Sequence, residues 1–253
     1  MWSDAAGRRN RRAVSELLGR LRCDVVALNE VPRHGRRLAT LARELGLHHA
    51  FADAGPIGNA LLSRRPLENV RVVSLGHGFA EPRSALIATV ATASGPIDVA
   101  CTHLDASREP ERIAQLDDLL GALASRAPAH LIVGDFNALR LSDYRPEALR
   151  AVRAMRKLSA VEAPTGKLIA RLDRAGYIDC YRFARAGSLA RYARQLGSPL
   201  PDDQLPTCWA GTRIDFIWAS RAALATLSPT RCWRIDSDAS DHVPVVAEFA
   251  RRP

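Results

Sequence analysis

Residues 130–137, HLIVGDFN, combine a short apolar run with polar residues placed directly after it. A run of this length, bounded by polar residues, is typical of a strand that is buried on both faces of a sheet. We therefore expect a strand over His130–Val133, with Asp135 and Asn137 at its carboxyl end. The segment before it, Glu109–Ser125, has apolar residues at helical spacing and predicts a helix that leads into this strand.

The same arrangement of an apolar strand and a terminal polar residue occurs near the start of the chain. The sequence DVVALN at Asp24–Asn29 predicts a buried strand that delivers Glu30 at its end. Amphipathic spacing predicts a helix on each side of this strand, over Arg8–Arg22 and Arg36–Leu45.

Strands dominate the middle and the end of the chain. Those predicted by apolar runs are Asn59–Ser63, Val70–Leu75, Ser84–Ala93, Pro96–Thr102, Thr212–Trp218, Arg231–Ile235 and Val243–Phe249. Strands that alternate with helices favour an α/β fold in one domain over residues 1–253, a four-layer sandwich of two packed mixed or antiparallel sheets flanked by helices. Residues 140–210 have weaker periodicity and are predicted to be a substrate-shaping insertion within that domain.

Polar residues near the predicted strand ends form an ordered series of motifs. In chain order these are Asn29-Glu30 in VALNEV, Asn59 in GNALLSR, Arg83 in EPRSAL, His103 in THLD, Asp135 and Asn137 in GDFNA, Asp215 in RIDFIWAS, and Asp241-His242 in SDHVPV. Each motif alone is common by chance. Together and in this order, they resemble the endonuclease/exonuclease/phosphatase superfamily over nearly the whole chain, from about Leu21 to Phe249.

This resemblance implies a phosphoesterase that depends on Mg²⁺, with Mn²⁺ as an alternative, and that hydrolyses a phosphodiester by in-line attack of an activated water. Glu30 and Asp241 would be the metal ligands, because carboxylate oxygens suit a hard cation. Asp215 would orient the ring of His242. Either His242 or Asp135 would be the general base, and the sequence leaves both assignments open.

The resemblance also implies roles for the remaining polar residues. Asn137 would donate a hydrogen bond to the phosphate or orient the water, and His103 would donate to a phosphate oxygen or contact the leaving group. Asn59 and Arg83 are expected to bind substrate. Asn59 also fits a turn after Gly58, and Arg83 also fits a surface ion pair.

The sequence does not select the substrate. A net charge of +9 and a pI near 10.0 favour a polyanion such as nucleic acid, although a generally solvated arginine surface gives the same total. DNA, RNA, inositol phosphate and a sphingomyelin-type headgroup remain alternatives, as does a non-catalytic nucleic-acid binder with the same fold. Trp209, Trp218 and Trp233 are predicted to be core residues rather than a platform for stacked bases.

The composition predicts a cytoplasmic monomer. The cysteines are widely spaced and are expected to be free; they are Cys23, Cys101, Cys180, Cys208 and Cys232. No stretch is apolar and long enough for a transmembrane helix. Members of the superfamily usually open with a strand that ends in Asn, and we expect that first strand to be missing before Met1-Trp2. A secreted protein fits equally well if the true N-terminus is not included.

Overall fold

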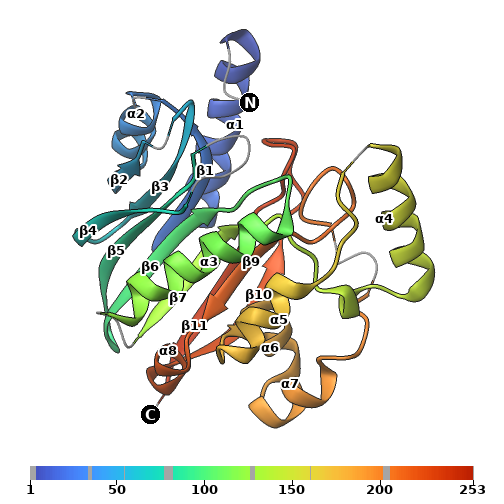
Figure 1. Cartoon of the computed structure of the whole chain (residues 1–253). Helices are drawn as coiled ribbons and strands as arrows, with labels where there is room; N and C mark the ends of the chain where they lie inside the picture. Colours follow the sequence, from blue (N-terminus) through green and yellow to red (C-terminus); the bar gives the residue numbers. More distant parts are fainter. Residues whose placement is uncertain are drawn as a thin grey trace.

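The structure, a computed structural model, describes residues 4–33, 36–53, 55–76, 82–125, 129–159, 161–201 and 206–252, with backbone only for residues 4–10 and 36. It contains two packed layers of strands with helices on their outer faces (Figure 1). The predicted α/β sandwich is therefore confirmed.

The elements follow the predicted order closely. The first are α1 (Asp4–Leu21), β1 (Val25–Pro32), α2 (Arg36–Leu45), β2 (His48–Ala52), β3 (Ile57–Ser63), β4 (Leu67–Ser74), β5 (Ser84–Thr92), β6 (Gly95–His103), α3 (Glu109–Ala124) and β7 (His130–Asp135). The rest are η1 (Leu141–Asp143), α4 (Pro146–Leu158), α5 (Lys167–Arg174), β8 (Ile178–Asp179), α6 (Cys180–Ala186), α7 (Leu189–Gln195), β9 (Asp215–Ala219), α8 (Arg221–Thr226), β10 (Leu227–Arg234) and β11 (Val245–Arg251). The sequence pattern does not predict β2, because this strand begins with two exposed histidines.

The larger sheet has six strands in the order β4-β5-β6-β7-β9-β8. Strands β6 and β7 are parallel, and α3 connects them across the outer face of the sheet (Figure 1). The other neighbouring strands of this sheet are antiparallel. The register pairs His103 with Asp135 and Asp135 with Asp215, so the ends of three adjacent strands meet at one edge.

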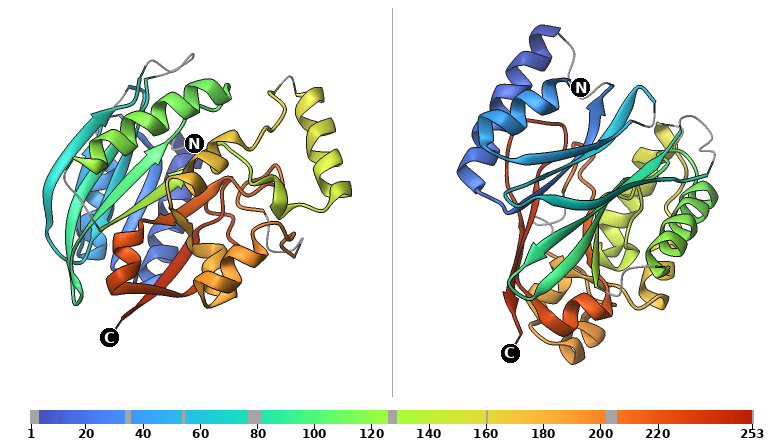
Figure 2. Two further views of the ribbon diagram at one scale, coloured as in Figure 1. Left: turned by 60° about the horizontal axis from the view of Figure 1, so that its bottom comes forward. Right: turned by 90° about the vertical axis from the view of Figure 1, so that its left-hand side faces the viewer.

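The second layer is built in two parts, a three-stranded sheet β1-β3-β2 and the two-stranded sheet β10-β11. The three-stranded part packs on the larger sheet through residues such as Leu61, and the two-stranded part packs on β9 through residues such as Val245. Among the described strands, β1 pairs only with β3 and β11 only with β10. Figure 2 shows both parts beside the larger sheet from two further directions.

Side-chain alternation in the larger sheet separates two cores, because successive residues of a strand point to opposite faces. Ile87 and Ile132 face α3 and α5, whereas Leu86 and Val133 face the second layer. On the far side of the second layer, α1 and α2 cover the three-stranded sheet with a further apolar cluster that includes Leu38.

Residues 140–210 contribute to the fold as well as to the surface. Strand β8 completes the edge of the larger sheet, and Leu168 and Leu172 of α5 pack in the core beneath α3. Helix α4 stands away from the sheets in both views (Figures 1 and 2). The predicted substrate-shaping role of this segment stays a prediction.

A buried ion network holds this segment to the start of β9. The Nη2 atom of Arg213 lies 2.7 Å from carboxylate oxygens of both Asp143 and Asp179, and Arg182 lies 2.6 Å from Asp143. These four side chains are at most 4% exposed. Since a buried charge is strongly destabilising without its partner, the network fixes Arg213, which stands two residues before Asp215 in the chain.

Several smaller predictions can also be compared with the structure. All five cysteines are free, and four of them are buried. Trp218 is fully buried, as predicted, and Trp233 is half-buried. The prediction for Trp209 is wrong, because this residue lies in a turn that projects from the sheets and its side chain is 78% exposed. No helix in the described ranges has the length and apolar character to cross a membrane.

Candidate active site

Three polar side chains stand in a row at the edge of the larger sheet. His103 ends β6, Asp135 ends β7 and Asp215 begins β9, and the strand register places them next to one another. The Nε2 atom of His103 lies 3.5 Å from Oδ2 of Asp135, and both side chains are almost completely buried. The sequence predicted His103 and Asp135 at strand ends but placed Asp215 inside a strand over Thr212–Trp218, whereas β9 begins at Asp215. The pairing of these strands brings the three residues together.

His242 joins this row from a distant part of the chain. An isolated antiparallel bridge pairs Cys208 with His242, and the ring Nδ1 of His242 lies 2.9 Å from Oδ2 of Asp215. The backbone N–H of Asp215 donates to Thr207 Oγ1, which fixes the strand beneath the pair. Polar atoms of Asp135, Asp215 and His242 all lie within 4.8 Å of one another. The predicted orientation of His242 by Asp215 matches this geometry.

The two imidazoles at this edge carry different charges. Burial lowers the pKa of His103 to about 3, and the positive charges of Arg83 and His242 act in the same direction. Burial also disfavours a charged His242, but the hydrogen bond and the charge of Asp215 outweigh it and raise the pKa of His242 to about 10. At neutral pH, His103 is therefore uncharged and His242 is a cation.

Arg83 determines the tautomer of His103. Its Nη1 atom lies 3.2 Å from Nδ1 of His103, and a guanidinium can only donate. Nδ1 must accept, so the ring proton is on Nε2, the atom that faces Asp135. Arg83 thus contacts a site residue.

Asp135 is a buried carboxyl group whose ionised form is disfavoured by its surroundings. Burial raises the pKa of Asp135 to about 8, and the negative charges of Asp215 and Glu30 add to this rise, while His242 opposes it. Glu30 lines the same pocket as His103, so the end of β1 lies beside the row of polar residues on the larger sheet. The two layers of the sandwich therefore meet at the site.

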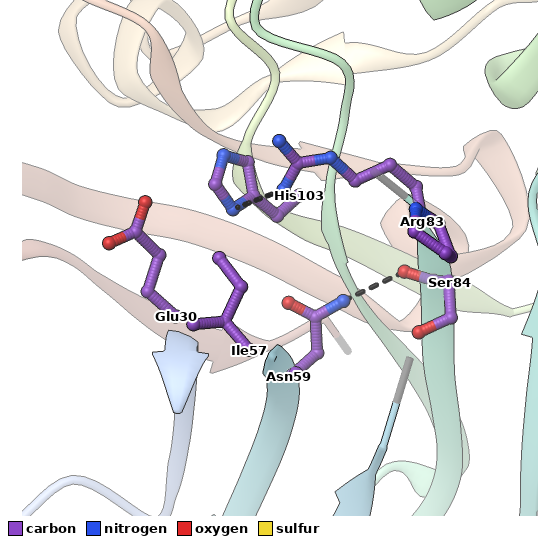
Figure 3. Close-up of a pocket in the computed structure, with 8 residues that line it drawn as sticks. Glu30, Ile57, Asn59, Arg83, Ser84 and His103 are labelled. Atoms are coloured by element: carbon purple, nitrogen blue, oxygen red, sulfur yellow. Dashed lines mark hydrogen bonds between the residues drawn. The ribbon is translucent and has the colours of Figure 1, made fainter. Parts of the chain in front are cut away.

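A small pocket lies where the two layers meet. Its lining includes Glu30 from β1, Asn59 from β3, Arg83 before β5 and His103 from β6. Glu30 and Asn59 point from their strands toward the space beside the His103 ring, with the Arg83 guanidinium next to that ring (Figure 3). The Asn59 amide donates to the Ser84 carbonyl at 2.7 Å, which fixes its orientation.

The carboxylate of Glu30 fits a cation ligand. No side chain or backbone group within the described residues donates a hydrogen bond to it, and its negative charge contributes to the raised pKa of Asp135. A bound cation would neutralise this charge and supply the partner that Glu30 lacks among these residues. Oxygen donors of this kind suit Mg²⁺ or Mn²⁺.

Backbone strain occurs at two of the predicted residues. Glu30 and Asn137 have φ values of 56° and 48°, in the left-handed region that non-glycine residues rarely adopt. At Glu30 the strain coincides with a register shift of β1 between Leu28 and Val31, which turns the side chain into the pocket. At Asn137 the backbone N–H donates to Asp135 Oδ1 at 2.7 Å, and the side-chain amide donates to the Leu104 carbonyl.

Asp241 is placed less centrally than its predicted metal role requires. Its side chain is exposed, Oδ1 accepts a hydrogen bond from Ser240, and it is not part of the group formed by Asp135, Asp215 and His242. Its role as a metal ligand stays a prediction.

Asn29 organises the site, although the sequence analysis gave it no role. Its side-chain N–H groups donate to Asn59 Oδ1 at 2.6 Å and to the Thr102 carbonyl at 3.0 Å, and its Oδ1 accepts from the Asp135 backbone at 3.0 Å. One amide thus links β1, β3, β6 and β7. Gly134 allows this approach, because a Cβ there would lie 1.9 Å from the Thr102 oxygen and 3.0 Å from Asn29 Oδ1.

Replacing Asn29 with Leu should destabilise the fold by about 1–3 kcal/mol, because it leaves polar partners on three other strands unsatisfied. We also expect lower activity, since Asn59 and the Asp135 backbone lose a shared contact. Denaturant unfolding and steady-state kinetics measure the two effects. Asn69→Gly is the control, because Asn69 is an exposed asparagine of β4 with a positive φ that glycine tolerates. Equal stability of the Asn29 and Asn69 variants would contradict the linking role.

The fold matches solved structures of nucleases and phosphatases. The human Nocturnin catalytic domain with bound sulfate is 21% identical, with a TM-score of 0.69, over 97% of this chain and 87% of that one. D. rerio TDP2 complexed with single-strand DNA product is 16% identical, with a TM-score of 0.65, over 96% and 92% of the two chains. The 3′ phosphatase NExo from Neisseria, bound to a product DNA hairpin, is 20% identical, with a TM-score of 0.63, over 94% and 93%.

Sequence comparison gives the family itself. No curated protein matches the chain significantly. The profile described as the Endonuclease/Exonuclease/phosphatase family, whose members are generally hydrolases of phosphoesters, matches residues 1–242. That range contains every residue of the row at the sheet edge and of the pocket beside it, so the chain belongs to the endonuclease/exonuclease/phosphatase family.

Proposed function

We propose that the chain is a divalent-metal-dependent phosphodiesterase that acts on nucleic acid. The observation that supports this most strongly is the carboxylate of Glu30, which has no hydrogen-bond partner among the described residues and lines the pocket beside His103, at the end of the polar row. Two similar structures hold DNA, one a single-strand product and the other a product hairpin. The net charge of +9 is consistent with a polyanionic substrate.

Glu30 is the carboxylate that would hold the metal, with Asp241 as the second candidate ligand. A bound Mg²⁺ or Mn²⁺ would neutralise charge on the phosphate oxygens and help to position the leaving group.

The protein's own residues would supply the remaining chemistry. His242, held as a cation by Asp215, would bind a non-bridging phosphate oxygen, which develops charge in the transition state. Asp135 would accept the proton of the attacking water, because a base whose pKa lies near the working pH transfers protons efficiently. His103 would donate its Nε2 proton as a hydrogen bond to a phosphate or leaving-group oxygen.

Removing the divalent cation tests the proposal directly. With EDTA we expect no hydrolysis of bis(p-nitrophenyl) phosphate, and Mg²⁺ or Mn²⁺ should restore it. Glu30→Gln removes the charge with little change in shape, and it should raise the Mg²⁺ concentration for half-maximal activity at least roughly tenfold. Glu44→Gln, at an exposed position on α2, is the matched control. Metal-independent turnover would contradict the proposal.

A substrate series separates the alternatives within the family. Single-stranded DNA, hairpin DNA, RNA, p-nitrophenyl phosphate, an inositol phosphate and sphingomyelin should be compared with Mg²⁺. We expect hydrolysis of the nucleic acids. Preferred turnover of the monoester, the inositol phosphate or the lipid would replace the nucleic-acid assignment, and salt-dependent DNA binding without turnover at any metal concentration would indicate a binding protein.

A further inference from the structure

Trp209 is an aromatic side chain that the fold does not use. It is 78% exposed and is the only aromatic residue among the exposed large hydrophobic residues of the described ranges. The other described tryptophans have partners: Trp218 stacks on Phe216 in the core, and Arg231 lies 4.6 Å over the ring of Trp233. Within the described residues, no ring or cation covers Trp209. Both faces of its indole are therefore available to a ligand.

The position of Trp209 in its turn explains this exposure. The Gly211 N–H donates to the Cys208 carbonyl at 3.0 Å and closes a turn in which Trp209 is the first central residue. Such positions favour proline or small polar residues, because the side chain projects away from the core. The buried side chain of Cys208, 7% exposed, makes the packing contact here instead. Folding thus provides no reason for a tryptophan at this position.

The turn is also held firmly beside the candidate active site. The Val243 N–H donates to the Thr207 carbonyl at 2.9 Å, and the Trp209 N–H donates to the Asp241 carbonyl at 2.9 Å. Cys208 is bridged to His242 between these two bonds. From the spacing of paired and consecutive strand residues, the Cα atoms of Trp209 and His242 are roughly 6 Å apart. A ligand whose phosphate is bound by His242 would bring its next chemical group to the turn that carries Trp209.

The chemistry of that group follows from the ring and from the charge. A flat, exposed indole binds either another π face or a quaternary ammonium cation. A chain with a net charge of +9 repels a cationic headgroup and attracts a polyanion. In a single strand, each nucleotide carries a planar base that is joined to its phosphate through one sugar. The base of a single strand is free to stack on a protein ring, whereas a base within a duplex is covered by its neighbours.

We propose that Trp209 is a stacking platform for the nucleobase next to the scissile phosphate, and that it gives the enzyme a preference for single-stranded over duplex substrate. This assignment rests on the proposed phosphodiesterase function and names the substrate that the site selects. Trp209 determines specificity and takes no part in bond cleavage.

The test compares two variants on two matched oligonucleotides. Trp209→Ala removes the platform, and Trp209→Phe keeps a smaller one. One oligonucleotide is an ordinary single strand, and the other has an abasic spacer on each side of the cleaved phosphate. We expect Trp209→Ala to raise KM roughly tenfold on the ordinary strand and less than twofold on the abasic strand, with Trp209→Phe between wild type and Trp209→Ala. For all three proteins, kcat on the abasic strand should stay within twofold, because that strand offers no base to stack beside the cleaved phosphate.

Binding gives a second measurement that does not depend on turnover. In the Glu30→Gln background, the fluorescence of Trp209 should be quenched by the ordinary single strand and not by the abasic strand. Trp233→Phe is the control, because its ring is already covered and its loss should leave the quenching intact.

The outcomes distinguish the two proposals. If the wild type does not hydrolyse the small diester with any divalent metal, the proposed function fails. If the wild type is active but Trp209→Ala raises KM equally for the ordinary and the abasic strand, the platform assignment is overturned while the proposed function stands. Selective loss of phosphocholine-ester hydrolysis in Trp209→Ala would overturn it as well and assign the ring to a quaternary ammonium group.

Discussion

Replacing His242 with Asn is expected to lower kcat by about 10²–10⁴-fold while the fold remains intact. The reason is the charge at this position, because Asp215 holds the imidazole as a cation with a pKa of about 10. Asn retains a hydrogen-bond donor but has no positive charge to offer to a phosphate oxygen. Steady-state kinetics on bis(p-nitrophenyl) phosphate measure the loss, and circular dichroism checks the fold.

The matched control is His49→Asn, at an exposed position of β2. It should retain the activity of the wild type, since that ring contacts no residue of the site. The pH profile adds a further measurement. If Asp135 is the base and His242 acts as a cation, the activity of the wild type rises as Asp135 loses its proton near pH 8 and falls as the pH rises through about 10. A rise in activity with a midpoint near that pH would instead assign His242 as the general base and contradict our assignment.

Replacing Asp135 with Asn is expected to abolish hydrolysis and to stabilise the folded chain at alkaline pH. Burial and the charge of Asp215 raise the pKa of Asp135 from its ordinary 3.8 to about 8. Between these values the folded chain binds more protons than the unfolded chain. The stability contributed by the protonated carboxyl is therefore present below about pH 4 and is lost as the pH rises through about 8. Asn cannot ionise, so the variant avoids that loss.

The measurement is the difference in Tm between Asp135→Asn and the wild type across pH. At pH 9 we expect the variant to melt at least about 3 °C higher, the shift that one kcal/mol produces in a chain of this size. The difference should shrink toward pH 4. Asp117→Asn is the control, because that carboxylate is exposed and pairs with Arg171 at the surface. A variant less stable than the wild type at pH 9 would show that Asp135 is not held in an unfavourable charge state.

Much of the site follows from local sequence. An apolar run that ends in a polar residue predicts a strand end, and His103 and Asp135 both lie at such ends. Asp215 joins them because neighbouring strands align their ends in one register, and this alignment is not visible in the sequence. The sequence places Asn29 in the series of motifs but gives it no role, because an amide at the end of an apolar strand looks the same whether it faces solvent or links four strands.

Trp209 is a second residue whose position could not be predicted from local sequence. Its position beside predicted strands suggested a core residue, but a tight turn between residues 208 and 211 directs the indole outward. An apolar side chain favours burial, and that preference can be read from the sequence. The direction in which the side chain points depends on the backbone conformation of the turn.

The sequence by itself determined the sandwich of two strand layers, the order of its strands and helices, and the residue types at the strand ends, because these depend on periodicity and on local backbone preference. Only the tertiary structure decided the protonation states of the site residues. The cation at His242, the neutral ring of His103 and the raised pKa of Asp135 depend on how deeply each group is buried and on which charges face it from other strands. Burial and Coulomb interactions act through space, so residues more than a hundred positions apart control one another once the layers have packed.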